Sequence, residues 1–162
     1  MPEMIFAHGW WLSGSDKMSK SLGNAVNPMG MADKYGVDAF RYFLLSEMVL
    51  GQDASFTEDS FVSKYNSDLA NDLGNLLSRV QKMIIKNCSA KIPKHGEFSP
   101  AEESLKKTCL EAVEAIISSV EEMRLDKGIS SVVSAVRSVN KYFEISAPWK
   151  LAKEGNQEKE VK

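Results

Sequence analysis

The sequence predicts a mainly α-helical protein in which a short β/α connecting region precedes a bundle of helices. Apolar residues recur at helical spacing over two long stretches, residues 58–87 and 126–145. A helix-start pattern at residues 99–102 lies between them, and short strand-like runs lie only near the N-terminus. With 162 residues and 43% hydrophobic residues, the chain can bury a core.

The first residues are expected to form strand, loop and strand. Met4 to Ala7 is a short apolar run, and Trp10 to Leu12 is a second one that ends at the turn Ser13-Gly14-Ser15. The segment Lys17 to Ser21, called the lysine loop below, follows directly. The expected strands would therefore support this loop.

Two short helices are expected next, over residues 31–35 and 37–50. Gly36 ends the first of them and Gly51 breaks the pattern of the second. Thr57 is suited to cap a following helix, so we place the main boundary of the chain at this residue.

A long helix is expected from Glu58 to Asn87. Its apolar face repeats every three or four residues and consists of Phe61, Tyr65, Leu69, Leu73, Leu76, Val80 and Met83. Such a stripe predicts one face packed on a core.

A polar row runs along another flank of this helix, where Asn71, Asn75 and Arg79 repeat every four residues. Asn is a poor residue for a helix interior, so two of them in one row call for a reason. An amide offers a donor and an acceptor to a base edge, and a guanidinium can bond to a base or stack on it. The alternative is a solvated helix face.

Two further helices complete the predicted bundle. Ser99-Pro100-Ala101-Glu102 has a capping Ser, a Pro at the first helical position and a Glu at the third, and this helix should reach about Met123. The next one is expected from Asp126 to Ile145 and to stop at Ala147-Pro148-Trp149.

Trp149 follows Pro148 at this break, where a large ring can be held rigid and partly exposed. Unpaired RNA bases stack on such rings for about 1–3 kcal/mol each. The alternative is a Trp that fills the bundle core. The last residues, 153–162, are highly charged and are expected to form a frayed tail.

Charge and cysteine usage exclude several classes of protein. The net charge of −2 provides no general basic field, so any RNA contact must be local. Cys88 and Cys109 belong to no Cys-x-x-Cys pattern and are expected to be reduced, half-buried thiols. No leader and no membrane-length apolar segment is evident. We therefore expect a cytoplasmic protein with no metal site in this chain and neither a membrane nor a DNA partner.

The lysine loop carries two amines, Lys17 and Lys20, among small residues. Ammonium groups on flexible stems, with nearby hydroxyls and amides, suit the oxygens of a polyphosphate and the charge that develops on departing pyrophosphate. Gly14 and Gly23 flank the loop and let it move. No Gly-x-x-x-x-Gly-Lys precedes the serines, so the loop is not a nucleotide-binding P-loop. The alternative is an exposed loop of solvated charges.

The stretch from His8-Gly9-Trp10-Trp11 to Asn27-Pro28 resembles the Lys-Met-Ser-Lys-Ser region of class I aminoacyl-tRNA synthetases. Later segments sharpen the resemblance to the methionyl-tRNA synthetases; they are Tyr35 to Tyr42, Tyr65 to Asn71, Gly74 to Arg79, Asn140-Lys141-Tyr142 and Ala147-Pro148-Trp149. Isoleucyl, valyl, leucyl and cysteinyl enzymes share the lysine loop but are less similar in these later segments.

The resemblance implies a ligase that activates methionine with ATP, accompanied by Mg²⁺, and transfers it to the tRNA for methionine. Lys17 and Lys20 would act on the ATP phosphates, and Met18, Ser19 and Ser21 would line the same site. The resemblance further implies that the first anticodon base is read by Asn75, Arg79, Pro148 and Trp149.

The resemblance also implies a division of the chain. Residues 1–57 would carry the lysine loop and a tRNA stem contact, residues 58–152 an incomplete helical bundle of the class I anticodon-binding type, and residues 153–162 a charged tail. Family members place a nucleotide-binding half before this region, so the chain alone is expected to be inactive. Two alternatives are a stand-alone, non-catalytic tRNA-binding module and another class I synthetase of the isoleucyl, valyl or leucyl type.

Overall fold

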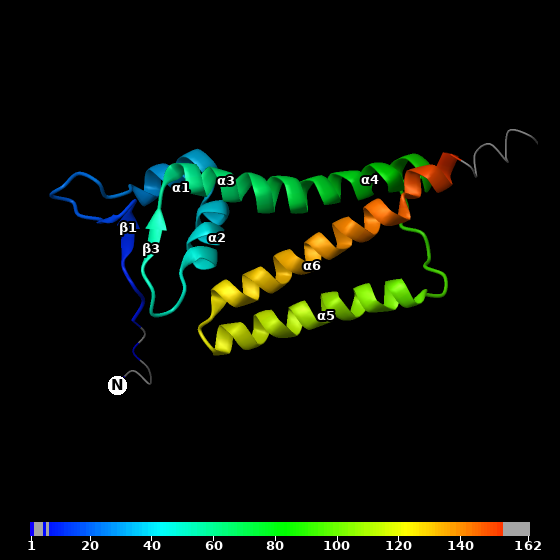
Figure 1. Cartoon of the computed structure of the whole chain (residues 1–162). Helices are drawn as coiled ribbons and strands as arrows, with labels where there is room; N and C mark the ends of the chain where they lie inside the picture. The colour runs from blue at the N-terminus through cyan, green and yellow to red at the C-terminus, as the bar shows by residue number, and fades with distance from the viewer. Residues whose placement is uncertain (2–4, 6, 154–162) are drawn as a thin grey trace, which may run out of the picture.

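The computed structural model describes residues 1, 5 and 7–153. A small sheet and two short helices lie at one end, and long helices extend from them to the other end (Figure 1). The first region contains β1 (Trp11–Ser13), β2 (Asp16–Lys17), α1 (Pro28–Tyr35), α2 (Val37–Glu47) and β3 (Ala54–Phe56). The predicted fold class, mainly helical with a short β/α region, is confirmed at this level.

The sheet has the strand order β2-β1-β3. β1 pairs antiparallel with β2, with Leu12 opposite Lys17, and parallel with β3, with Trp11 opposite Ala54. β3 was not predicted, because a three-residue strand is defined by a partner far away in the chain and not by its own sequence pattern. In the strand expected at residues 4–7, Met4 and Phe6 lie outside the described residues, and Ile5 and Ala7 are not in a strand.

The core of this end is aromatic. Met31, Phe40, Phe43, Phe56 and Phe61 are all buried, and Phe61 has no exposed surface. The ring of Phe43 lies with its centre 5.4 Å from that of Phe56 and 5.4 Å from that of Phe61. Because Phe61 follows the boundary at residue 57, this core fixes the long helix to the region that carries the lysine loop.

The long helix consists of α3 (Glu58–Lys64), the π-helix η1 (Tyr65–Gly74) and α4 (Asn75–Asn87). Thr57 caps α3 as predicted, in a capping box with Ser60. One uniform α-helix was predicted, but the wider π-turns rotate the side chains out of the expected register.

Two residues of η1 show this rotation. Leu73, expected in the apolar row, is 49% exposed, whereas Asp68 is buried. The predicted apolar face is therefore wrong at Leu73, and a carboxylate lies inside the structure next to the predicted row.

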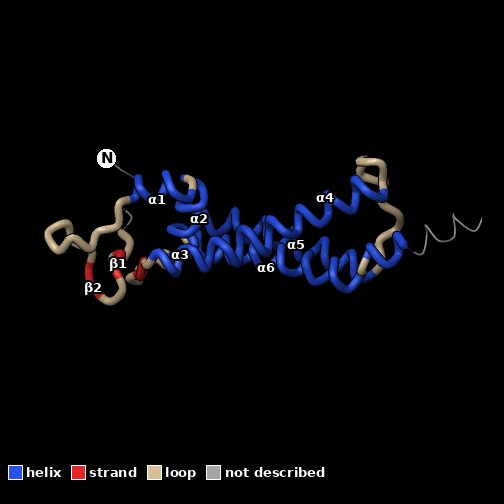
Figure 2. Tube along the Cα trace, turned by 90° about the horizontal axis from the view of Figure 1, so that it is seen from above, coloured by secondary structure: helices blue, strands red, loops and turns tan. Residues whose placement is uncertain are grey.

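The other two long helices, α5 (Pro100–Glu121) and α6 (Leu125–Ser146), form a hairpin. The predicted capping box of Ser99 and Glu102 starts α5. α6 packs along α5 and also on α2 and η1, and it lies between α5 and the long helix (Figure 1). Figure 2, seen from above, shows the strands and α1 at one end of the molecule and the long helices running to the other end. A Cβ at Gly128 would lie 2.9 Å from that of Ser119, which shows how closely the two helices approach.

The outer face of α5 is apolar and exposed. Leu110, Val113, Ile117 and Val120 are each more than half exposed. No helix in the described part of the chain is long and apolar enough to cross a membrane.

Replacing Phe61 by Ala should lower the free energy of unfolding by about 3–5 kcal/mol, because the ring contributes to the aromatic core and leaves a cavity. Urea unfolding followed by circular dichroism measures this change. Leu77→Ala on the same long helix is the control, since Leu77 is 56% exposed and its truncation should cost less than about 1 kcal/mol. Equal losses in both variants would contradict the assignment of Phe61 to the core.

Candidate functional site

The lysine loop starts at the end of β2, so Lys17 is a strand residue while the other four residues lie between β2 and α1. The side chain of Asn24 closes the turn. Its Oδ1 accepts a hydrogen bond from the Ser19 amide at 2.8 Å, and its Nδ2 donates to the Lys17 carbonyl at 3.3 Å. Gly23 has φ 67° and its amide donates to the Lys20 carbonyl. Asn24 was not predicted as a site residue, although Asn is common in turns.

The polar groups of the loop remain accessible. The hydroxyls of Ser19 and Ser21 lie 2.7 Å apart and share a hydrogen bond. Neither Lys17 nor Lys20 forms an ion pair within the described part of the chain, and Met18 packs against the aromatic core. Two unpaired ammonium groups on the same loop as two hydroxyls can bind several oxygens of an anionic ligand at once.

The predicted polar row divides into two parts. Asn71 and Asn75 are exposed, and the Asn75 amide donates to Asn71 Oδ1 at 3.4 Å. Arg79 turns instead toward α6, where its Nη2 donates to Asn140 Oδ1 at 2.6 Å and its Nη1 pairs with Glu144. Its buried Nε has no hydrogen-bond partner among the described residues.

Arg79 also contacts an aromatic ring near the end of α6. The guanidinium lies 5.2 Å from the centre of the Phe143 ring, and that ring lies 5.7 Å from the ring of Trp149. We call Arg79, Asn140, Phe143, Glu144 and Trp149 the Arg79 cluster. Sequence analysis predicted Arg79 and Trp149 but missed the three residues of α6 that join them.

The backbone at the end of α6 holds Trp149 in place. Ala147 adopts φ 40° and ends the helix, after which Pro148 starts a further helical segment over residues 148–153. Trp149 is half-buried, so it neither fills a closed core nor stands free in solvent.

Basic residues gather in the sequence beside this cluster. Between Arg79 and Gly96 the charged residues are all basic, and two further lysines lie within four positions after Trp149; these lysines are Lys82, Lys86, Lys91, Lys94, Lys150 and Lys153. The end of α4, the following loop and the end of α6 lie at the same end of the molecule (Figure 1). The net charge of the chain therefore hides a local basic region.

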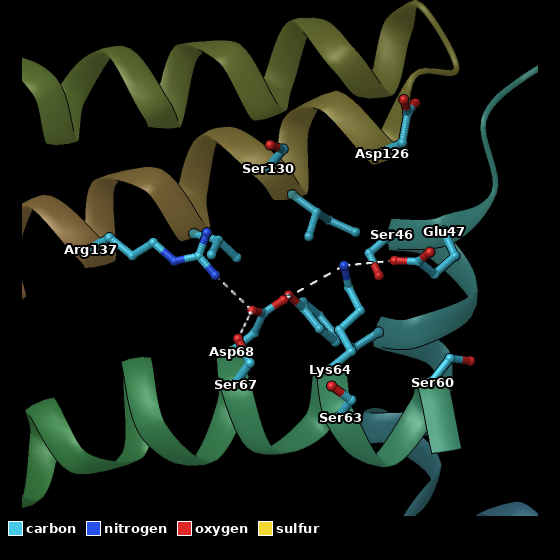
Figure 3. Close-up of a pocket in the computed structure, with 13 residues that line it drawn as sticks. Ser46, Glu47, Ser60, Ser63, Lys64, Ser67, Asp68, Asp126, Ser130 and Arg137 are labelled. Carbon is cyan, nitrogen blue, oxygen red and sulfur yellow. Dashed lines mark hydrogen bonds and ion pairs between the residues drawn. The ribbon is translucent and has the colours of Figure 1, made fainter. Parts of the chain in front are cut away.

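A buried carboxylate, that of Asp68, connects α2, the long helix and α6 (Figure 3). Asp68 accepts hydrogen bonds from Tyr42 at 2.8 Å, Ser67 at 2.9 Å and Arg137 at 2.9 Å, and Lys64 Nζ lies 3.7 Å away. These five residues, the Asp68 network, line a cavity of about 390 Å³ between α2, the long helix and α6. Sequence analysis missed it, because the π-turn that buries Asp68 is not apparent in the pattern.

The Asp68 network continues to the Arg79 cluster along η1 and α6. Arg137 Nε donates to Asp72 at 2.7 Å, and Asn140 Nδ2 donates to the Asp72 carbonyl at 2.8 Å. Asn140 in turn accepts from Arg79. A continuous series of hydrogen bonds thus links α2 to the Arg79 cluster.

Hydrogen bonds and charges decide the ionisation of this network. Burial alone would raise the pKa of Asp68, but hydrogen bonds from Tyr42 and Ser67, with the charges of Lys64 and Arg137, hold that pKa below its usual value. Burial and the hydrogen bond to Asp68 raise the pKa of the Tyr42 hydroxyl. Asp68 is therefore a carboxylate and Tyr42 a neutral donor near pH 7.

Among the described residues, no group of three His, Cys, Asp or Glu side chains is placed to hold a metal ion. Cys88 and Cys109 are half-buried and are not joined in a disulfide.

The chain matches a known protein family over its first half. The family described as tRNA synthetases class I (M) matches residues 1–81, half of the chain, including the lysine loop and the start of the long helix. The chain belongs to this family.

Individual relatives extend the similarity to nearly the whole chain. It is 39% identical over 153 residues to a methionine–tRNA ligase of Brucella suis and 41% identical over 162 residues to one of Enterococcus faecalis, covering 94% and 99% of this chain. A solved structure, Mycobacterium tuberculosis methionyl-tRNA synthetase in complex with methionyl-adenylate, matches 97% of this chain with a TM-score of 0.89 and 38% identity.

The predicted resemblance to the methionyl-tRNA synthetases is confirmed by these relatives. The chain spans 30% of the B. suis protein, 24% of the E. faecalis protein and 31% of the M. tuberculosis chain.

Replacing Asp68 by Asn should make the free energy of unfolding vary less with pH in the acid range. A carboxylate with a lowered pKa contributes stability that is complete above its ordinary value of 3.8 and is lost as pH falls through the lower folded value. At pH 7 the variant should lose about 1–3 kcal/mol, because it leaves donors unsatisfied, and the loss should shrink as pH falls below 3.8.

Urea unfolding at several pH values between 7 and 3 measures this difference. Asp59→Asn on the same helix is the matched control, since Asp59 is an exposed residue of α3. An Asp68→Asn loss that stays constant over the whole pH range would contradict the proposed ionisation.

Proposed function

We propose that the chain is part of a cytoplasmic methionine–tRNA ligase, which activates methionine with ATP and transfers it to the tRNA for methionine. The observation that carries this proposal is the lysine loop, whose turn is closed by Asn24 while neither amine forms an ion pair with any residue that the structure describes. Methionyl-adenylate, bound by the similar M. tuberculosis enzyme, is the product that methionine and ATP form in the first step.

In the proposed reaction, Lys17 and Lys20 bind the ATP phosphates and neutralise the charge that develops on the departing pyrophosphate. The hydroxyls of Ser19 and Ser21 supply further donors, and Met18 anchors the loop on the aromatic core. Mg²⁺ would arrive with ATP, because phosphate oxygens and water are its usual ligands. The lysine loop would not bind methionine itself.

The anticodon would bind at the other end, at Asn75, Arg79, Pro148 and Trp149. The Arg79 cluster offers a guanidinium held over the Phe143 ring, which in turn lies next to the Trp149 ring, and the nearby lysines supply local attraction for phosphates. Glu144 pairs with Arg79, so a bound base has to share the guanidinium with this carboxylate. Asn75 lies one turn before Arg79 and is exposed, and its amide, which donates to Asn71 Oδ1 at 3.4 Å, would bond to a base edge in place of Asn71.

The proposed division of the chain is 1–57 for the lysine loop and a tRNA stem contact, 58–152 for the anticodon-binding bundle, and 153–162 for a charged tail. The aromatic core crosses the first boundary at Phe61. The two parts would therefore move as one unit around this residue.

Lys20→Ala in a full-length ligase that carries this chain should slow methionine-dependent pyrophosphate exchange about a hundredfold, because one charge contact to the leaving group is lost. Affinity for the tRNA should change little. Lys127→Ala, an exposed lysine of α6, is the matched control. A normal exchange rate in Lys20→Ala would refute the phosphate role.

The alternative function, a non-catalytic RNA-binding module, has a separate test. If the wild-type chain alone binds ATP, this alternative loses its support.

Trp149→Ala should weaken binding of a methionine-tRNA anticodon stem-loop by about 1–3 kcal/mol, the value of one base stacked on an aromatic ring. Trp149→Phe should retain most of the affinity. The measurement is a fluorescence-anisotropy titration at fixed salt with labelled stem-loops that have the natural or a changed first anticodon base. Equal affinity of wild type and Trp149→Ala would contradict the anticodon assignment.

A further inference from the structure

Trp10 lies directly beside the lysine loop on the neighbouring strand segment. Leu12 of β1 is opposite Lys17 of β2, and Trp10 precedes Leu12 by two residues, so all three side chains lie on one face of the hairpin. Long and aromatic side chains reach such diagonal neighbours. The Lys17 ammonium indeed lies 3.4 Å from the centre of the Trp10 ring.

The backbone of Trp10 is fixed by the segment that leads into β3. Its amide donates to Asp53 Oδ1 at 2.7 Å, and its carbonyl accepts from the Ala54 amide at 2.9 Å. Gly9, just before it, lies so close to Gln52 that a Cβ there would be 2.0 Å from the Gln52 carbonyl oxygen. The backbone that carries the Trp10 ring is therefore held in a fixed position.

The Trp10 ring contributes little to the core. Its residue is 60% exposed, whereas the adjacent Trp11 packs on Phe43 and Phe56. Within the described residues Lys17 has no carboxylate partner, so the ring is the group that holds its ammonium. A cation over an indole face is attracted by the ring electrons.

We infer that Trp10 is a positioning residue for the lysine loop: its ring holds the Lys17 ammonium in place for the phosphates of ATP. This inference rests on the proposed function. Lys17 has a flexible four-carbon stem, and ordering it costs entropy unless a neighbour has ordered it already. One side of the ammonium faces the ring, and its remaining N–H donors stay available for phosphate oxygens.

The kinetic test is a double-mutant cycle in a full-length ligase that carries this chain. Trp10→Leu should lower the pyrophosphate-exchange rate at saturating ATP about two- to fivefold, the range of an exposed cation–π contact, and Trp10→Phe should restore most of the loss. In a Lys17→Met background, Trp10→Leu should have no further effect. An equal loss in both backgrounds, or no loss in Trp10→Leu, would overturn the inference.

The spectroscopic test uses the 162-residue chain and does not depend on catalysis. The Lys17 ε-methylene protons should resonate upfield because of the Trp10 ring current, and the shift should vanish in Trp10→Leu and persist in part in Trp10→Phe. Phe98→Leu is the matched control, since it removes a ring 5.3 Å from the Lys106 ammonium and should leave Lys17 unchanged. Tripolyphosphate, the added probe, should shift the Lys17 and Trp10 signals together.

The two tests separate two kinds of failure. A Lys17→Met enzyme with normal exchange would overturn the proposed phosphate role of Lys17, and with it the positioning role. Loss of exchange in Lys17→Met together with an unshifted Lys17 signal in the wild-type chain would leave the proposed function intact and overturn the role of Trp10 alone.

Discussion

The buried carboxylate of Asp68 is the interaction on which the arrangement of the long helices depends. It accepts hydrogen bonds from α2 through Tyr42 and from α6 through Arg137, while it belongs to η1 itself. Burying a charge costs free energy unless hydrogen bonds and opposite charges offset that cost. The carboxylate is therefore stable only when α2, η1 and α6 are all in place, which makes the relative position of these three elements specific.

The same helix, α6, then connects the Asp68 network to the Arg79 cluster. Arg137 and Asn140 lie about one turn apart and both bind Asp72 of η1, one through the side chain and one through the carbonyl. Asn140 also holds Arg79. Because Arg137 and Asn140 lie on the same helix, a shift of α6 that moves Arg137 would also move Asn140 and its contact with Arg79.

Much of the fold follows from local chemistry that the sequence displays. The caps at Thr57 and Ser99 and the end of α6 before Pro148 agree with prediction, since each depends on residues a few positions apart. The strand β3 and the π-helix were missed, because both are determined by contacts with distant residues. At the site, the two lysines and Arg79 are predicted from residue type and spacing. Asn24, Phe143 and Glu144 were not, since their role appears only when the chain has folded around them.

The π-helix has a consequence for which replacements this segment tolerates. A π-turn holds more residues than an α-turn, so residues 65–74 make fewer turns around the helix axis than they would in an α-helix. If this segment became α-helical without a change in its length, every residue after it would face another side of the helix relative to α3. Arg79 would then leave α6 and Asp68 would lose its position inside the structure, although no residue of either group had been replaced. A replacement in η1 that favours α-helical over π-helical turns should therefore disturb both groups at once.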